Sequence, residues 1–143
     1  MPISMSRYAE ELVAPMRKEL TDLGVEELLT PERVDEIIKK TPGTVMVIVN
    51  SVCGCAAGGA RPGIRKALNN HKRPGLMTTV FAGVDIDATK KAREYFVGYA
   101  PSSPSVALFK DGKIVYMMER FQIEGRLPEM IADDLISAFN KYC

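Results

Sequence analysis

The sequence has 143 residues, of which 46% are apolar and 26% are charged, and these proportions predict one globular domain over residues 1–143. The 19 lysines and arginines nearly balance the 18 aspartates and glutamates, which argues against a nucleic-acid partner or an anionic membrane surface. The longest strongly apolar run, residues 45–49, is too short to cross a bilayer, and residues 1–5 lack the features of a signal peptide. We therefore expect a cytoplasmic protein that does not span a membrane.

Residues 1–40 are predicted to form two helices that pack on the domain. In the first, apolar residues recur at every fourth position, as on one face of a helix: Tyr8, Leu12, Met16 and Leu20. Pro15 falls inside this pattern, so we expect it to kink or divide the helix. The second helix has Thr30 as its N-cap and Pro31 in its first turn, and residues 41–43 end it.

Two buried strands and a helix are predicted in the middle of the chain. Residues 44–50 and 78–84 are rich in apolar and β-branched residues, which is typical of parallel strands covered by helices on both faces. Residues 56–70 between them have the apolar spacing of a helix, which Pro62 should bend. A further helix is expected after the second strand, with Asp87 as its N-cap.

The last third of the chain predicts an antiparallel hairpin and a final helix. Residues 105–110 and 113–118 are expected to be strands, because the Asp-Gly pair at residues 111–112 is a strong signal for a two-residue turn. The final helix begins near Leu127 and has one apolar face. The whole order predicts an α/β fold with a mixed four-stranded sheet, two parallel strands plus the hairpin, and helices on both faces.

A pair of cysteines, Cys53 and Cys55, flanks a single glycine directly after the first predicted strand. Functional sites of open α/β sheets form at the carboxyl ends of strands, and a helix N-terminus favours a thiolate over a thiol. The helix dipole contributes up to about 2 kcal/mol, and one pKa unit corresponds to about 1.36 kcal/mol, so the pKa of the thiol is expected to fall by roughly one unit. We predict that Cys53 is the reactive thiolate and Cys55 the resolving thiol.

A disulfide between these two cysteines would close a very small ring. Such a ring contributes less than about 2 kcal/mol to stability before strain is subtracted, and a strained disulfide is easily reduced. The spacing therefore indicates a pair that shuffles or removes disulfides rather than a structural bridge. Gly54 permits the tight backbone, and the small residues 56–59 leave the surface open to a bulky partner.

Two other functions are compatible with the same cysteines. Closely spaced thiolates would also bind Zn or Cu(I), but a closed zinc site needs four ligands, and His71 and Cys143 lie at no recognisable metal-binding spacing. The second alternative is a non-catalytic interaction domain. We favour thiol–disulfide exchange, with no metal site and no tightly bound cofactor.

Two segments carry a resemblance to a known family. Residues 50–58, which read NSVCGCAAG and are followed by Ala60-Arg61-Pro62, resemble the signature of the bacilliredoxins. Residues 100–105, which read APSSPS, match a second motif of that family, and the similarity covers essentially the whole chain, including Cys143.

The resemblance implies a thioredoxin-like fold and an enzyme that removes bacillithiol from mixed disulfides on client proteins. Cys53 would attack the mixed disulfide and carry the bacillithiol, and Cys55 or a second bacillithiol, as thiol co-substrate, would release it. Weak isomerase or reductase activity is also implied. Pro104 matches the cis-proline that faces the cysteines in thioredoxins, so Gly54, Ser103 and Pro104 are expected to bind substrate. The first buried strand has no carboxylate where thioredoxins bury an aspartate.

Overall fold

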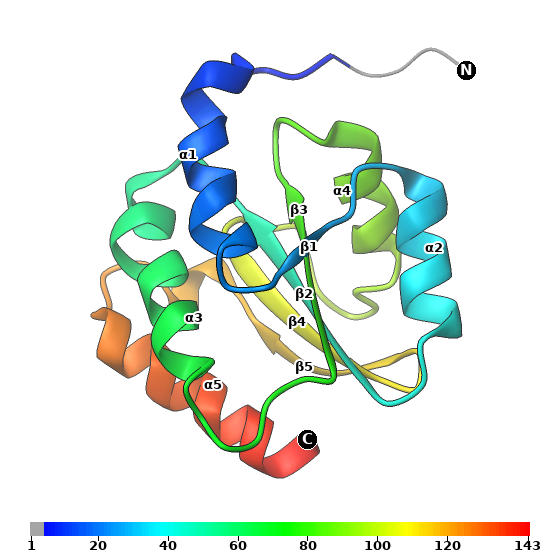
Figure 1. The fold of residues 1–143 in the computed structure, drawn as a ribbon, viewed down its shortest axis with the longest axis vertical. Coiled ribbons are helices and arrows are strands. Elements are labelled where there is room, and N and C mark those ends of the chain that lie inside the picture. The colour runs from blue at the N-terminus through cyan, green and yellow to red at the C-terminus, as the bar shows by residue number, and fades with distance from the viewer. Residues whose placement is uncertain (1–4) are drawn as a thin grey trace.

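The computed structural model describes residues 5–143; residues 1–4, which contribute to the signal-peptide expectation, lie outside the described part. A five-stranded sheet in the order β1-β3-β2-β4-β5 has helices on both faces (Figure 1). The strands are β1 (Glu26–Glu27), β2 (Thr44–Asn50), β3 (Leu76–Phe81), β4 (Ser105–Lys110) and β5 (Lys113–Met118). The α-helices are α1 (Glu10–Thr21), α2 (Pro31–Lys40), α3 (Arg61–Ala67), α4 (Ile86–Glu94) and α5 (Pro128–Tyr142). A π-helix (Ala56–Ala60) precedes α3, and a short 3-10 helix (Arg120–Gln122) follows β5.

The sheet confirms the predicted strand directions and corrects the strand count. β2 pairs with β3 in parallel and with β4 antiparallel, and β4 and β5 form the predicted hairpin. Asp111 and Gly112 have φ of 49° and 82°, as a two-residue turn of this kind requires. The prediction of four strands was wrong, because β1 adds a fifth by pairing with β3 at the edge of the sheet. Its two residues are both glutamates, so no apolar alternation marks them as a strand.

The central strand β2 is buried on both faces, as its composition predicts. Met46 and Ile48 belong to a core that includes residues of α3 and α5. Val45, Val47 and Val49 point to the opposite face and belong to a core that includes residues of α2 and α4. Since helices cover both faces, the free carboxyl end of β2 is where a functional group can reach solvent.

α3, which follows the turn after β2, packs closely against α5 at Gly63. A Cβ added at Gly63 of α3 would lie 2.7 Å from Ile131 Cγ2 of α5, which is too short for any side chain. The predicted single helix over residues 56–70 is instead the π-helix followed by α3, which ends at Ala67. π-helical turns occur frequently at functional sites.

Several predicted boundaries were wrong. α1 runs through Pro15, so the proline does not divide the helix, and the alternative of a kink stays a prediction. β3 ends at Phe81, before Gly83 turns the chain with φ of 79°. The N-cap position of α4 is Asp85 rather than Asp87, and the Asp85 carboxylate accepts a hydrogen bond from Arg17 Nη2 at 2.8 Å. Within residues 5–143, none of the helices combines the length and apolar character needed to span a membrane.

Candidate active site

The two cysteines lie together in the turn between β2 and the π-helix. Their sulfur atoms are 2.6 Å apart, both are free thiols, and both side chains are half-buried. The backbone N–H groups of Ala56 and Ala57 donate to the Cys53 carbonyl at 3.1 and 3.2 Å, which closes the turn. Gly54 between them is exposed, and a Cβ built there would meet no heavy atom within 4 Å among the described residues. The turn thus holds both sulfurs close together beside an open surface.

The environment favours the thiolate form of Cys53. Burial raises the pKa of this thiol, but hydrogen bonds from Cys55, from Ser51 and from the backbone N–H groups of Ala56 and Cys55 outweigh it. The pKa of Cys53 therefore lies below its ordinary value. The direction of this shift agrees with the effect expected from a helix N-terminus, and its causes are the N–H groups of Cys55, the N-cap, and Ala56, the first residue of the π-helix, together with two side chains.

The environment of Cys55 has the opposite effect. Burial, the hydrogen bond to Cys53 and the negative charge on Cys53 all raise the pKa of Cys55, and the positive charge of Arg120 only partly opposes them. Because the two groups are in direct contact, ionisation of one disfavours ionisation of the other. The opposite directions of the two pKa shifts favour Cys53 over Cys55 as the group that ionises first.

This asymmetry predicts the order in which the cysteines react with an alkylating agent. As pH rises, Cys53 should become reactive first, because its pKa is lowered, whereas burial raises the pKa of Cys143. Iodoacetamide labelling of the reduced protein across a pH series, with each cysteine followed by peptide mass spectrometry, measures this order. Labelling of Cys53 no earlier than Cys143 would contradict the assignment of the thiolate.

Buried polar contacts fix the end of β2 from which Cys53 projects. Arg61 is 3% exposed, and its Nη1 donates to Asn50 Oδ1 at 3.0 Å and to the Ser51 carbonyl at 2.8 Å. Its Nε donates to Glu19 of α1 at 3.0 Å, and Asn50 Nδ2 donates to the Met16 carbonyl at 3.2 Å. Arg61 therefore ties α1, the end of β2 and the start of α3 to one another.

The second predicted segment reaches the same edge of the sheet. The Ser103–Pro104 peptide bond is cis, as the resemblance implies, and Pro104 is buried. The segment lies next to the end of β2, because Ser105 pairs with Val49. Arg120 connects the two segments, since its Nη1 donates to the Ser103 carbonyl at 2.9 Å and its charge acts on both cysteine sulfurs.

Sequence reasoning assigned no role to three residues that shape this site: Ser51 and Arg61, which it named only as part of the family signature, and Arg120. Arg61 carries a weak signal, because it is a charged residue between small and apolar neighbours at the start of a helix. Arg120 carries none, because it begins a short 3-10 helix that no sequence pattern predicts and lies far from the cysteines in sequence.

In the described part of the chain, the fold brings no further metal-ligating side chains to the two cysteines that the metal alternative invokes. Within residues 5–143, no group of three or more His, Cys, Asp or Glu side chains is placed to hold a metal ion. His71 and Cys143, the other soft ligands considered, do not join Cys53 and Cys55 in such a group. The site offers two thiols, whereas a closed zinc site needs four ligands.

Known proteins with similar sequences decide the family. The pattern of a family described as "Disulphide isomerase" matches residues 8–143. The chain is 55% identical to a bacilliredoxin of Cytophaga hutchinsonii, over 94% of this chain and 98% of that protein. The chain belongs to the bacilliredoxin family. A bacilliredoxin of Koribacter versatilis is 50% identical over 95% of this chain and 94% of its own length.

Solved structures confirm the fold that the bacilliredoxin resemblance implies. A protein described as having a thioredoxin fold matches with a TM-score of 0.61 at 17% identity, over 86% of this chain and 97% of that one. Mitochondrial thioredoxin 3 from Saccharomyces cerevisiae matches with a TM-score of 0.54 at 14% identity, over 83% of this chain and 96% of its own. Membership of the bacilliredoxin family, together with this fold, makes the chain a thiol–disulfide oxidoreductase.

Proposed function

We propose that this protein removes bacillithiol from mixed disulfides on the cysteines of client proteins in the cytoplasm. The observation that carries the proposal is the pair of adjacent sulfurs in which Cys53 has a lowered pKa and Cys55 a raised one. A thiolate is the nucleophile of disulfide exchange, and a neighbouring thiol is what a resolving step requires.

In the first step, the Cys53 thiolate attacks the bacillithiol sulfur of the mixed disulfide. A new bond forms between this sulfur and Cys53 Sγ, the bond to the client sulfur breaks, and the client thiolate leaves and takes up a proton from water. Gly54, which is exposed, and the Ser103–Pro104 segment, which precedes the Ser105 that pairs with Val49 of β2, would contact the client backbone. The bacillithiol is then held on Cys53.

In the second step, Cys55 attacks Cys53 Sγ and releases bacillithiol, leaving a Cys53–Cys55 disulfide. The negative charge of Cys53, which raises the pKa of Cys55, is gone once Cys53 is in a mixed disulfide. Burial remains as a cause that raises this pKa, and the charge of Arg120 favours the Cys55 thiolate. Two molecules of bacillithiol would then reduce the Cys53–Cys55 disulfide and be oxidised to their own disulfide. The same nucleophile would also support the weak isomerase or reductase activity that the resemblance implies.

The test offers the reduced protein a client that carries a single bacillithiol mixed disulfide. We expect intact-mass spectrometry to show loss of the adduct from the client, and either an adduct or an internal disulfide on this protein. A client that keeps its adduct through many equivalents of the reduced protein would overturn the proposal. Stoichiometric Zn or Cu(I) in the purified reduced protein, together with an intact client adduct, would favour the metal alternative.

A further inference from the structure

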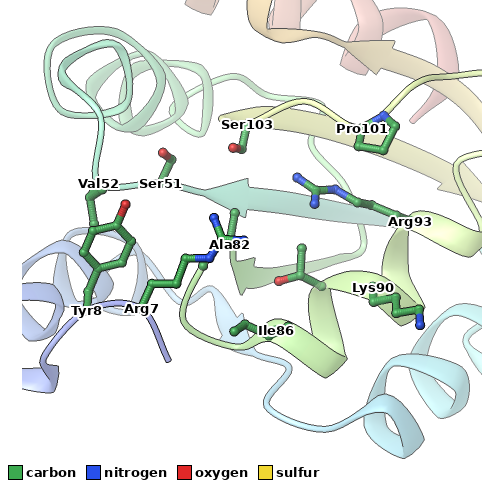
Figure 2. Close-up of a pocket in the computed structure, with 12 residues that line it drawn as sticks. Arg7, Tyr8, Ser51, Val52, Ala82, Ile86, Lys90, Arg93, Pro101 and Ser103 are labelled. Atoms are coloured by element: carbon green, nitrogen blue, oxygen red, sulfur yellow. The ribbon is translucent and has the colours of Figure 1, made fainter. Parts of the chain in front are cut away.

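A cavity of about 460 Å³ opens beside the active-site turn (Figure 2). Its walls come from segments far apart in the sequence, namely the chain before α1, the end of β2, α4 and the segment before β4. Ser51 and Val52, which line it, directly precede Cys53, and Ser103, which also lines it, directly precedes the cis-proline. The Cys53 N–H donates to Ser51 Oγ at 3.3 Å, so one wall of the cavity is joined to the nucleophile.

All the described charged side chains that line this cavity are cationic. Three cationic side chains line it, Arg7, Lys90 and Arg93, and no aspartate or glutamate does. Within residues 5–143, none of these three cations forms an ion pair with a carboxylate. In Figure 2 the Arg93 guanidinium points toward Ser103, whereas the Lys90 side chain points away from it. An anion in the cavity would meet two arginines without having to displace a competing carboxylate.

Two buried polar atoms in the wall lack hydrogen-bond partners among the described residues. They are Thr89 Oγ1 and Arg93 Nε, and Thr89 is only 3% exposed. Buried hydrogen-bond donors and acceptors of folded proteins nearly always have partners. Two unpartnered polar atoms in one wall of the cavity therefore point to a bound ligand that supplies the missing hydrogen bonds. A carboxylate would accept from both the Arg93 Nε–H and the Thr89 hydroxyl. Burial also lowers the pKa of Arg93, and an adjacent anion would relieve this effect.

We propose that this cavity binds the carboxylate-bearing part of the low-molecular-weight thiol whose sulfur is transferred to Cys53. The inference rests on the proposed function and adds the chemical class that the site selects. The cavity has the size of a small-molecule site, which favours a small thiol over a segment of a client protein. Arg93 and Thr89 would hold the carboxylate while Cys53 Sγ forms its bond to the sulfur of the same molecule.

The test compares two mixed disulfides on the same client cysteine, one with mercaptosuccinate and one with neutral 2-mercaptoethanol. The ratio of kcat/KM for the two adducts is divided by the ratio for cleavage by dithiothreitol, which corrects for their intrinsic reactivity. We expect a preference for the mercaptosuccinate adduct that Arg93→Gln lowers by about tenfold or more, as loss of a charge-assisted hydrogen bond implies. Thr89→Val, which keeps the shape but removes the hydroxyl, should lower it by a smaller factor. The exposed Arg65→Gln on α3 is the matched control and should keep the wild-type ratio.

Each outcome separates this inference from the function on which it rests. Removal of both adducts with no corrected preference would overturn the carboxylate site and leave the proposed function standing. A bacillithiol adduct on the same client cysteine is the third substrate: its removal with neither surrogate removed would overturn the carboxylate site, and removal of none of the three would overturn the proposed function itself. The same assay also tests whether a client side chain, rather than a small thiol, occupies the cavity. It uses two client peptides that have either Asp or Gln beside the modified cysteine. A preference that follows the Asp and disappears in Arg93→Gln would assign the cavity to a client side chain and overturn the small-thiol site. If Arg93→Gln fails to fold by circular dichroism, Thr89→Val alone decides the result.

Discussion

Replacing Cys53 with serine should lower the rate of mixed-disulfide removal by about a thousandfold or more, because the hydroxyl that replaces the thiolate is not ionised near neutral pH. The pKa of Cys53 is lowered by contacts with Cys55 and Ser51 and by two backbone N–H groups. In the serine variant these contacts have no thiolate to stabilise. The measurement is the turnover of a bacillithiol-modified client by the wild type and the variant under the same conditions.

Cys55→Ser is the companion variant and should behave differently. It keeps the attacking sulfur, and serine retains a hydroxyl that can donate to it, so the first step should survive. Release of the bound thiol should then depend on the concentration of added bacillithiol. Cys143→Ser, at the exposed C-terminus, is the matched control and should retain wild-type turnover. Equal turnover by Cys53→Ser and Cys143→Ser would refute the assignment and favour a non-catalytic domain.

Replacement of the buried Arg61 by methionine should destabilise the fold more than any other single substitution at the site. The change removes the donors to Asn50 Oδ1 and to the Ser51 carbonyl, which are part of a buried network at the end of β2. Asn50 Oδ1 keeps the Ser51 N–H as a donor at 2.9 Å and loses one hydrogen bond, worth about 1 kcal/mol. The Ser51 carbonyl is left unsatisfied at a cost of about 1–3 kcal/mol, so we expect a total loss of about 3 kcal/mol. The ion pair with Glu19 adds little to this figure, because the Glu19 side chain is 48% exposed and stays hydrated without its partner.

Thermal denaturation followed by circular dichroism measures this effect, and the loss corresponds to a Tm lower by about 10 °C. Arg65→Gln, on the exposed side of the same helix, should change the Tm by little. Because Arg61 also positions the segment before Cys53, the surviving folded protein should label more slowly with iodoacetamide at neutral pH. A Tm equal to that of Arg65→Gln would mean that the network does not support the turn.

The parts of the fold that were predictable depend on local patterns. The burial of β2 on both faces follows from its composition, and the hairpin follows from the Asp-Gly pair at residues 111–112. The position of Cys53 at the end of a central strand follows in turn from that strand. Each of these features is decided within a few residues of sequence.

The parts that could not be predicted depend on partners that are distant in sequence. β1 is a strand only because β3 offers an edge for Glu26 and Glu27 to pair with. Asp85 rather than Asp87 takes the N-cap position of α4, where Arg17 of α1 meets its carboxylate. The charge of Arg120 acts on the cysteines because Arg120, just after β5, bonds to the cis-proline segment, which no periodicity in the sequence indicates.

The most direct test of the whole account is to locate the transferred thiol. Reduced Cys55→Ser protein is mixed with one equivalent of a client that carries a bacillithiol mixed disulfide, and the products are digested and mapped by mass spectrometry. We predict that the client loses its adduct and that the bacillithiol appears on the peptide that contains Cys53. An adduct found on Cys143 instead, or a client cleared with no adduct on this protein, would contradict attack by Cys53.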